Sequence, residues 1–315
     1  MRDILITGGA GFIGSNLAHK LQELYPETRI VVFDKFRDGT KFDTSHNERF
    51  LGHFKNLIGF RGEIIAGDLR NKSDLEKLKK YDFGTIFHEG AVSDTTVIDE
   101  NFVMETNLNS FHDLIELAKE KNAKLIYASS AGTYGNSPAP NRVGEGENPE
   151  NVYGFSKLMM DRVAQNSDYK NIIGLRYFNV YGEREKYKMN SASMIFQLRN
   201  QILETGRVRL FEFGEQKRDF VYIDDVVQAN LLAMRSDANG IFNVGSGIAR
   251  TFNDIVEILL SEMKEIVEIE YIKNPYTFYQ NHTEADISKT EKILGYEPEF
   301  SLEDGIKKYL ESDLI

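Results

Sequence analysis

Tyr153 and Lys157 form a Tyr-x-x-x-Lys pair, and Ser129 and Ser130 precede that pair in the chain. Residues four apart share one face of a helix, so the Lys157 ammonium would lie beside the Tyr153 phenol or beside a ribose bound next to it. A nearby cation lowers the pKa of a tyrosine from about 10, and a serine hydroxyl can hold a substrate alcohol. These residues predict proton transfer with Tyr153 as the acceptor. Taken alone, such a pair more often lies on an exposed surface helix.

A glycine-rich segment near the N-terminus supports a catalytic interpretation of the Tyr153–Lys157 pair. It follows the apolar run Ile4–Thr7 and reads Gly8-Gly9-Ala10-Gly11-Phe12-Ile13-Gly14. Glycines at a strand-to-helix turn let the backbone approach a pyrophosphate at the helix N-terminus. Asp34 ends the second β-branched run, 20 residues after Gly14, where a carboxylate accepts a hydrogen bond from a ribose hydroxyl. This spacing predicts a dinucleotide site rather than a plain turn.

The residues after Asp34 leave the choice between NAD and NADP open. The Asp34 carboxylate would bind a free ribose 2′-hydroxyl and repel a 2′-phosphate. Lys35, Arg37 and Lys41 lie in the same predicted loop and would favour that phosphate, unless they form only a solvated face. From the residues alone, both cofactors remain possible.

Two further segments follow predicted strands. Asp68 is placed to accept from the adenine amino group, although an aspartate after a strand is also typical of a helix cap. Glu89, Gly90 and Ala91 follow His88, and the small residues among them would let the pyrophosphate pass.

The chain before residue 178 alternates short β-branched runs with longer amphipathic stretches. Strands are predicted at Ile4–Thr7, Arg29–Phe33, Glu63–Ala66, Thr85–His88, Lys124–Ser129 and Ile172–Tyr177. Helices are predicted at Gly14–Leu24, Ser73–Lys80, Asn107–Lys121 and Tyr153–Gln165. This alternation predicts an α/β fold built on a doubly wound parallel sheet of the Rossmann type.

After Tyr177 the pattern changes to a long polar loop through Lys188, a helix at Ala192–Thr205 and a strand at Val208–Phe213. Phe220–Ile223, a helix at Asp224–Met234 and a strand at Gly240–Val244 suggest a return to the main sheet. We therefore predict a dinucleotide-binding domain of residues 1–178 plus about 222–248. A smaller α/β substrate lobe would contain about 179–221 plus 249–315.

Composition excludes several other classes of protein. The net charge of −11 leaves no surplus of cations for a nucleic-acid backbone or an anionic membrane surface. No cysteine is present, so disulfides, thiolate zinc sites and a cysteine nucleophile are excluded, and we expect no metal. The first apolar run is too short for a signal peptide or a membrane span, which predicts a cytoplasmic protein.

The glycine loop, Ser129-Ser130-Ala131 and the Tyr-x-x-x-Lys pair, in this order, resemble the extended short-chain dehydrogenase/reductase family. That family includes sugar-nucleotide epimerases and dehydratases. Segments 176–182 (Arg-Tyr-Phe-Asn-Val-Tyr-Gly) and 218–222 (Arg-Asp-Phe-Val-Tyr) are similar to it as well. Its 4,6-dehydratases carry an Asp-Glu acid/base pair just after the active-site Ser or Thr, where this chain has Ala131-Gly132. The resemblance therefore implies an epimerase.

Further segments resemble the ADP-heptose 6-epimerase branch of the family: 38–42 (Asp-Gly-Thr-Lys-Phe), 88–91 (His-Glu-Gly-Ala) and 179–185 (Asn-Val-Tyr-Gly-Glu-Arg-Glu). In that branch a lysine faces the sugar from the side opposite the tyrosine, and Lys188 is the matching residue. The resemblance implies four catalytic residues, Tyr153, Lys188, Lys157 and Ser130, and it favours NADP over NAD. The cofactor-binding residues it implies are Gly8, Gly11, Phe12, Ile13, Gly14, Asp34, Lys35, Lys41, Lys55, Asp68, Glu89, Gly90, Ala91, Ser93, Asn107, Tyr153, Lys157 and Val180.

The same resemblance implies a set of substrate-binding residues: Ser130, Asn179, Lys188, Asn190, Gln197, Phe211, Glu212, Arg218 and Tyr279. Arg218 would clamp the diphosphate through its guanidinium fork, the alternative being a surface ion pair with Asp219. Three positions depart from the pattern, because Glu183 replaces a proline, Asn190 a serine and Gln197 a histidine. Both amides can still donate hydrogen bonds to a substrate.

The activity implied is epimerisation of an ADP-linked heptose at C6, by transient oxidation with bound NADP and reduction on the opposite face. The partner would be a small nucleotide sugar, with no nucleic acid or membrane. The protein would be a homo-oligomer, a pentamer by resemblance, and its product would feed lipopolysaccharide core synthesis. Three alternatives remain: a GDP-linked substrate, a hexose-nucleotide 4-epimerase that needs Tyr153 alone, and an inactive family member that senses NADP.

Overall fold

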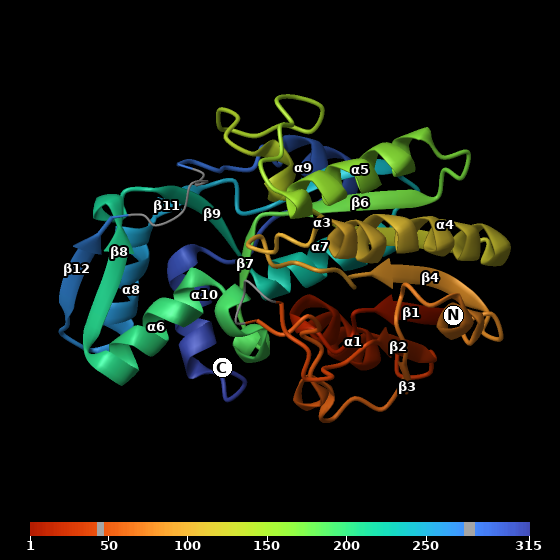
Figure 1. The fold of residues 1–315 in the computed structure, drawn as a ribbon, viewed down its shortest axis with the longest axis horizontal. Coiled ribbons are helices and arrows are strands. Elements are labelled where there is room, and N and C mark those ends of the chain that lie inside the picture. The colour runs from red at the N-terminus through yellow and green to blue at the C-terminus, as the bar shows by residue number, and fades with distance from the viewer. Residues whose placement is uncertain (43–46, 274–280) are drawn as a thin grey trace.

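A seven-stranded parallel sheet forms the larger part of the molecule (Figure 1). The computed structural model describes residues 1–42, 47–273 and 281–315. The strand order in the sheet is β10-β6-β5-β4-β1-β2-β3. The strands are β1 (Asp3–Thr7), β2 (Ile30–Asp34), β3 (Glu63–Ala66), β4 (Phe83–His88), β5 (Lys124–Ser130), β6 (Ile172–Tyr177) and β10 (Gly240–Val244). The order reverses between β1 and β4, which is where such sheets bind ligands.

Both faces of this sheet are covered by helices, as the alternating apolar side chains require. On β1, Ile4 and Ile6 belong to one hydrophobic cluster and Leu5 to the other. The first cluster includes α1 (Phe12–Leu24) and α7 (Ile223–Arg235), and the second includes α4 (Ser110–Lys121) and α5 (Val152–Asn166). The α/β fold with a doubly wound parallel sheet, predicted from the sequence, is thereby confirmed.

Two smaller sheets lie at the other end of the molecule from β1–β3 (Figure 1). One consists of β11 (Ala249–Thr251), β9 (Lys217–Tyr222) and β7 (Asn179–Tyr181), and the other of β12 (Glu268–Ile272) and β8 (Arg207–Phe211). The helices α6 (Met194–Thr205), α8 (Phe252–Met263) and α10 (Leu302–Glu311) accompany them. The remaining elements are η1 (Phe54–Leu57), α2 (Lys72–Glu76), α3 (Glu100–Met104), η2 (Glu105–Asn109), η3 (Ala131–Tyr134), η4 (Glu185–Ser191), η5 (Glu212–Gly214) and α9 (Ser288–Leu294).

One predicted strand lies in a different sheet from the one expected. The segment Phe220–Ile223 does not return to the main sheet, because β9 pairs with β7 in parallel and with β11 in antiparallel orientation. Only β10 returns, where it pairs with β6. An apolar run signals a strand but not its neighbours, so the sequence had no means of separating the two sheets.

The predicted division into a dinucleotide-binding domain and a substrate lobe is not tested by strand pairing and stays a prediction. Among the residues that the structure describes, no helix is long and apolar enough to cross a membrane.

Candidate active site

A cavity of about 410 Å³ lies where β1, β2, β4, β5 and β6 end, at the edge of the sheet where ligands bind in this fold. It collects many of the residues that the sequence predicted. Those that line it are Gly8, Gly11, Phe12, Ile13, Gly14, Asp34, Lys35, Asp68, Glu89, Gly90, Ala91, Ser93, Ser130, Tyr153, Lys157, Asn179, Val180 and Lys188. Segments far apart in the sequence therefore meet around one space.

The glycine loop is packed so closely that side chains would not fit. Gly8 has a φ of 67°, and a Cβ on it would lie 2.5 Å from the Gly90 backbone nitrogen. A Cβ on Gly14 would collide with the carbonyl oxygen of Gly8. Helix α1 begins just after Gly11, and no side chain caps its first N–H groups in the described structure. Those donors and the helix dipole favour an anion such as a pyrophosphate, so the loop fits a dinucleotide.

Asp34, the last residue of β2, is hydrogen-bonded to the glycine loop. Its carboxylate is buried and accepts hydrogen bonds from the backbone nitrogens of Ala10 at 2.9 Å and Phe36 at 2.8 Å. Burial raises the pKa of this carboxyl, although the two backbone donors oppose the shift. The Lys35 ammonium lies 3.5 Å from Asp38 and 5.1 Å from the Phe50 ring centroid. Asp34 and Lys35 thus line the same part of the cavity with opposite charges.

The Tyr153–Lys157 pair lies on the first turns of α5, which begins where Asn151 caps the backbone nitrogen of Gly154 at 2.8 Å. The Lys157 ammonium is buried, donates to the carbonyl oxygen of Ala128 at 2.7 Å and lies 6.0 Å from the Tyr153 ring centroid. Lys157 is therefore fixed against β5 with Tyr153 one turn away on the same face. Lys157 is buried and Tyr153 half-buried, so the pair does not lie on an exposed surface helix, and its catalytic role stays a prediction.

The predicted lowering of the Tyr153 pKa is wrong for this structure. Burial raises the pKa of the phenol, the hydrogen bond with Ser130 lowers it, and the Glu89 carboxylate raises it. The spacing of Tyr153 and Lys157 indicates a nearby positive charge, but it does not show the cost of placing a phenolate in a site largely shielded from water. Ser130 itself caps η3, because its hydroxyl accepts from the Gly132 nitrogen at 3.0 Å.

Glu89 is a titratable group of the cavity whose electrostatic role the sequence did not predict. One carboxylate oxygen accepts from the Tyr177 hydroxyl at 3.0 Å, and that hydroxyl accepts from the Asn230 amide at 2.8 Å. Burial raises the pKa of Glu89 to about 7. Burial lowers the pKa of Lys157 to about 8, against the opposing charge of Glu89. Both groups can therefore change protonation near neutral pH.

Lys188 reaches the same cavity from η4, a segment in the polar loop after β7. The side chain is half-buried, with its ammonium 5.3 Å from the Phe12 ring centroid. Burial lowers the pKa of Lys188, and the buried Glu185 carboxylate opposes the shift. Glu185 in turn accepts from the Ser193 nitrogen at 2.6 Å and the Gly182 nitrogen at 3.1 Å. The structure thus provides a second proton-transfer candidate beside the first.

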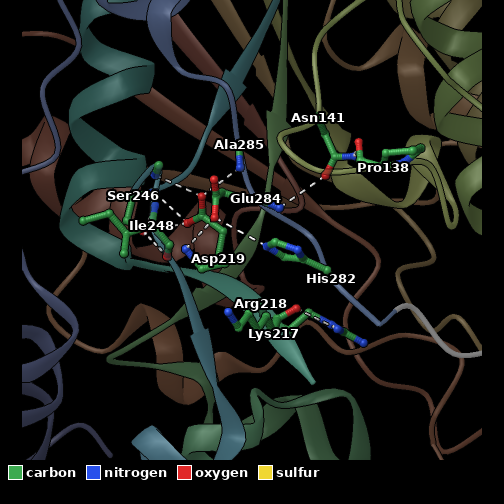
Figure 2. Close-up of polar contacts among 12 residues, drawn as sticks. Pro138, Asn141, Lys217, Arg218, Asp219, Ser246, Ile248, His282, Glu284 and Ala285 are labelled. Carbon is green, nitrogen blue, oxygen red and sulfur yellow. Dashed lines mark hydrogen bonds and ion pairs between the residues drawn. The ribbon is translucent and has the colours of Figure 1, made fainter. Parts of the chain in front are cut away.

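Arg218 lies on β9, and Figure 2 shows how that strand is held. Arg218 is buried, and so is Asp219, so the alternative of a surface ion pair between them is wrong. The Asp219 carboxylate accepts from the Ser246 nitrogen and hydroxyl, both at 2.7 Å, and from the backbone nitrogens of Gly247 and Ala285 at 2.9 and 3.0 Å. These bonds fix β9 to two later segments of the chain.

Several predicted residues lie outside the lining of this cavity. They are Lys41, Lys55, Asn107, Asn190, Gln197, Phe211 and Arg218. The Gln197 amide donates to the carbonyl oxygens of Asn190 and Ala192, and Asn107 bonds to Val92 and Ser156. Tyr279 lies outside the described residues, as does the side chain of Glu212. The roles assigned to all site residues from the sequence stay predictions.

Other lining residues had no role in the sequence argument, among them Arg49, Phe50, Leu51, Tyr177, Ser191, Ala192, Ser193 and Met194. Tyr177 had a usable signal, because it ends a predicted strand beside Phe178 and Asn179. Phe50 had none, since it reaches the cavity through an irregular loop between β2 and β3. Loops without periodicity give no indication of where they fold.

A glycine loop, a buried lysine and a half-buried tyrosine one turn from it, at the carboxyl edge of a doubly wound sheet, define a nicotinamide-dependent enzyme of the Rossmann class. The model of the NAD dependent epimerase/dehydratase family matches residues 4–245, and the chain belongs to that family. The family resemblance and the prediction of an epimerase rather than another class of enzyme are confirmed.

Solved structures of the family include specific epimerases similar to this chain. The ADP-L-glycero-D-manno-heptose-6-epimerase of Helicobacter pylori is 52% identical, with 98% of this chain and 95% of that chain covered and a TM-score of 0.90. The UDP-glucose 4-epimerase of Thermotoga maritima is 29% identical, with 98% and 97% covered and a TM-score of 0.87. The UDP-glucuronic acid 4-epimerase of Bacillus cereus, solved with NAD, is 28% identical, with 98% and 97% covered and a TM-score of 0.84.

Proposed function

We propose that this enzyme interconverts ADP-D-glycero-D-manno-heptose and ADP-L-glycero-D-manno-heptose by inverting C6. The observation that carries the proposal is that Tyr153 and Lys188, from separate elements, line one cavity together with the glycine loop. Inversion through a planar ketone requires an acid/base group at the oxygen of each epimer, and two such groups on separate elements can serve the two epimers in turn. The 52% identity to the Helicobacter pylori heptose epimerase supports the same substrate.

Residues at different positions around the cavity would transfer protons, orient the substrate and hold the cofactor. Tyr153 holds or releases the hydroxyl proton of one epimer, and Lys188 does so for the other, its lowered pKa giving a larger neutral fraction near neutral pH. The Ser130 hydroxyl orients the reacting oxygen beside Tyr153. Lys157 and the backbone of Gly8, Gly11 and Gly14 would hold the cofactor, which when bound supplies hydride acceptance and hydride return.

NADP rather than NAD is the cofactor that we propose. Both oxygens of the Asp34 carboxylate already accept backbone hydrogen bonds, and burial raises the pKa of that carboxyl. Asp34 is therefore a weaker repulsive charge than its place in the sequence suggested. Lys35 lines the cavity next to it and favours a phosphate. By family resemblance we also propose a cytoplasmic homo-oligomer whose product enters lipopolysaccharide core synthesis.

Proton NMR of ADP-heptose incubated with the purified enzyme tests the substrate. We expect the two C6 epimers to equilibrate, and the Lys188→Ala variant to be slower by at least about 100-fold, a typical contribution of a general acid or base. GDP-heptose and UDP-glucose serve as the competing substrates. Conversion of UDP-glucose to UDP-galactose with no change in ADP-heptose would overturn the assignment in favour of a 4-epimerase.

Mass spectrometry of the cofactor released by denaturation tests the proposed choice of NADP over NAD. We expect NADP, with its extra phosphate, from protein purified without added nucleotide. Recovery of NAD alone would contradict the proposal. Bound NADP with no turnover of any nucleotide sugar would identify an inactive member of the family instead.

A further inference from the structure

Lys188 has no long element to hold it in place. It belongs to η4, a seven-residue segment, and the next residue, Met189, has a φ of 54°. Such a segment owes its position to contacts made by side chains from elsewhere in the chain. Many of those contacts come from the loop between β2 and β3, which lies on the cofactor side of the cavity.

Tyr187, the residue before Lys188, makes the most specific of these contacts. Its ring stacks on the His53 imidazole with the centroids 3.8 Å apart and the planes 3° from parallel. The Arg37 guanidinium donates to the Tyr187 carbonyl oxygen and lies 5.9 Å from the Tyr187 ring centroid. The His53 Nδ1 accepts from the Lys55 nitrogen at 3.2 Å, and burial lowers the pKa of the imidazole, so a neutral ring stacks on Tyr187.

The same turn is bonded to the glycine loop. The backbone nitrogen of His53 donates to the Ala10 carbonyl oxygen at 2.9 Å, and the Asn56 amide donates to that oxygen at 3.1 Å. The Asn56 carbonyl oxygen accepts from Arg184 at 3.1 Å, one residue before η4 begins. Residues 53–56 therefore touch both the loop that would hold the pyrophosphate and the segment that carries Lys188.

We propose that Tyr187 is a positioning residue that couples dinucleotide binding at the glycine loop to the placement of Lys188. This inference rests on the proposed function, because it gives Lys188 its acid/base role. Energetic coupling between two sites is reciprocal, so loss of the Tyr187–His53 stack weakens cofactor binding and misplaces the ammonium together. A stacked aromatic pair contributes about 0.5–1.5 kcal/mol, which corresponds to roughly a 2- to 13-fold change in an equilibrium constant.

Tyr187→Leu removes the stack and keeps the backbone carbonyl that Arg37 binds. Rapid mixing of the NADP-loaded enzyme with each epimer separately reports the two oxidation steps through the absorbance of the reduced cofactor. One epimer is the one whose oxidation Lys188→Ala slows by at least about 100-fold, and we expect Tyr187→Leu to slow oxidation of that epimer by about 10-fold. Oxidation of the other epimer stays within about twofold of the wild type, since Tyr153 serves it.

Calorimetric titration of cofactor-free enzyme with NADP provides a readout apart from activity. We expect Tyr187→Leu to bind NADP about 3- to 10-fold more weakly, and Tyr187→Phe to retain wild-type affinity and rates because it keeps the ring. Tyr271→Leu is the matched control, since Tyr271 is a half-exposed tyrosine on β12, outside the cavity lining. It should leave both readouts unchanged. His53→Ala should reproduce the Tyr187→Leu pattern if the leucine variant folds poorly.

A double variant separates positioning from a general structural effect. If Tyr187 acts through Lys188, Tyr187→Leu/Lys188→Ala is no slower than Lys188→Ala alone. This inference is overturned if Tyr187→Leu slows oxidation of both epimers equally. It is also overturned if Tyr187→Leu behaves like the wild type while Lys188→Ala is slow. Either outcome leaves the proposed function standing. Unchanged oxidation of both epimers by Lys188→Ala overturns the proposed role of Lys188 and this inference with it.

Discussion

Tyr153 and Lys188 line the same cavity but are held there in different ways. Tyr153 is on α5, where Tyr153, Lys157 and Asp161 follow one another at four-residue intervals on one face. Asp161 is fully buried and accepts from the Tyr127 hydroxyl on β5 and the Arg176 guanidinium on β6, both at 2.8 Å. This helix is bonded directly to the central strands of the main sheet.

Lys188 has a support of another kind. Its short segment η4 follows Arg184, which has a φ of 71°, and is interrupted by Met189, also at positive φ. Hydrogen bonds to Glu185 and ring contacts to Tyr187 hold it, and these partners come from several parts of the chain. Regular secondary structure therefore positions one of the two proposed proton-transfer groups, and side-chain contacts position the other.

The two regions have the same electrostatic arrangement, a lysine beside a carboxylate. Each has a lysine whose pKa burial lowers and a carboxylate that opposes the shift, Glu89 for Lys157 and Glu185 for Lys188. Substitution of these two carboxylates therefore separates the effect of the neighbouring charge on the pKa of each lysine from the effect of the surrounding fold.

Asp161→Ala should have the largest effect, because it removes the anchor of the helix that holds Tyr153. Loss of one partner from a buried ion pair costs about 3–5 kcal/mol, since the Arg176 charge is left poorly compensated. We expect a decrease of that size in the free energy of unfolding, measured by denaturant titration.

Asp168→Ala is the matched control for this variant. Asp168 lies just beyond α5, and its exposed carboxylate pairs with Lys119 at 2.7 Å, a type of surface pair that contributes little to stability because water screens it. Equal effects of the two substitutions would show that the buried network adds nothing to the support of α5.

The same difference between regular elements and irregular loops explains which residues could be predicted from the sequence. Tyr153 and Lys157 have helical spacing, and the glycine loop follows a strand, so periodicity alone predicted both and the sheet behind them. Lys188 was identified only through resemblance, because a polar loop has no period. The neighbours of β9, the pKa of Tyr153 and the contact of Tyr187 with His53 depend on distant segments, which no local pattern encodes.

Glu185→Gln should have an intermediate effect, in the region of Lys188. The carboxylate accepts from the Ser193 nitrogen, the Ser193 hydroxyl and the Gly182 nitrogen, and an amide cannot accept from all of them. A buried donor left unpaired costs about 1–3 kcal/mol. We expect a decrease in the free energy of unfolding within that range, smaller than that of Asp161→Ala.

Glu185→Gln also tests the charge on Lys188. The Glu185 carboxylate raises the pKa of that lysine, so its removal lets Lys188 lose its proton at lower pH. The rising limb of the pH profile for oxidation of the epimer served by Lys188 should move to lower pH. Glu204→Gln, an exposed glutamate on α6, is the control. A shift to higher pH would contradict the proposed base.

Glu89→Gln should have the smallest effect on stability, and one that depends on pH. The folded pKa of Glu89 is raised to about 7 from the ordinary 4.5, so between these values the unfolded chain loses a proton that the folded protein keeps. The stability of the wild type therefore falls as pH rises through that window, by about 1–2 kcal/mol for a group beside an open cavity.

Glutamine does not titrate, so the free energy of unfolding of Glu89→Gln, relative to wild type, should rise by that amount between pH 4.5 and 7. Lys157 titrates higher, with a pKa of about 8, and further changes in its ionisation fall above this window. Denaturant titrations of both proteins across the window measure the difference. A pH-independent difference would mean that Glu89 is ionised throughout this window, and that Lys157 keeps a negative charge beside it.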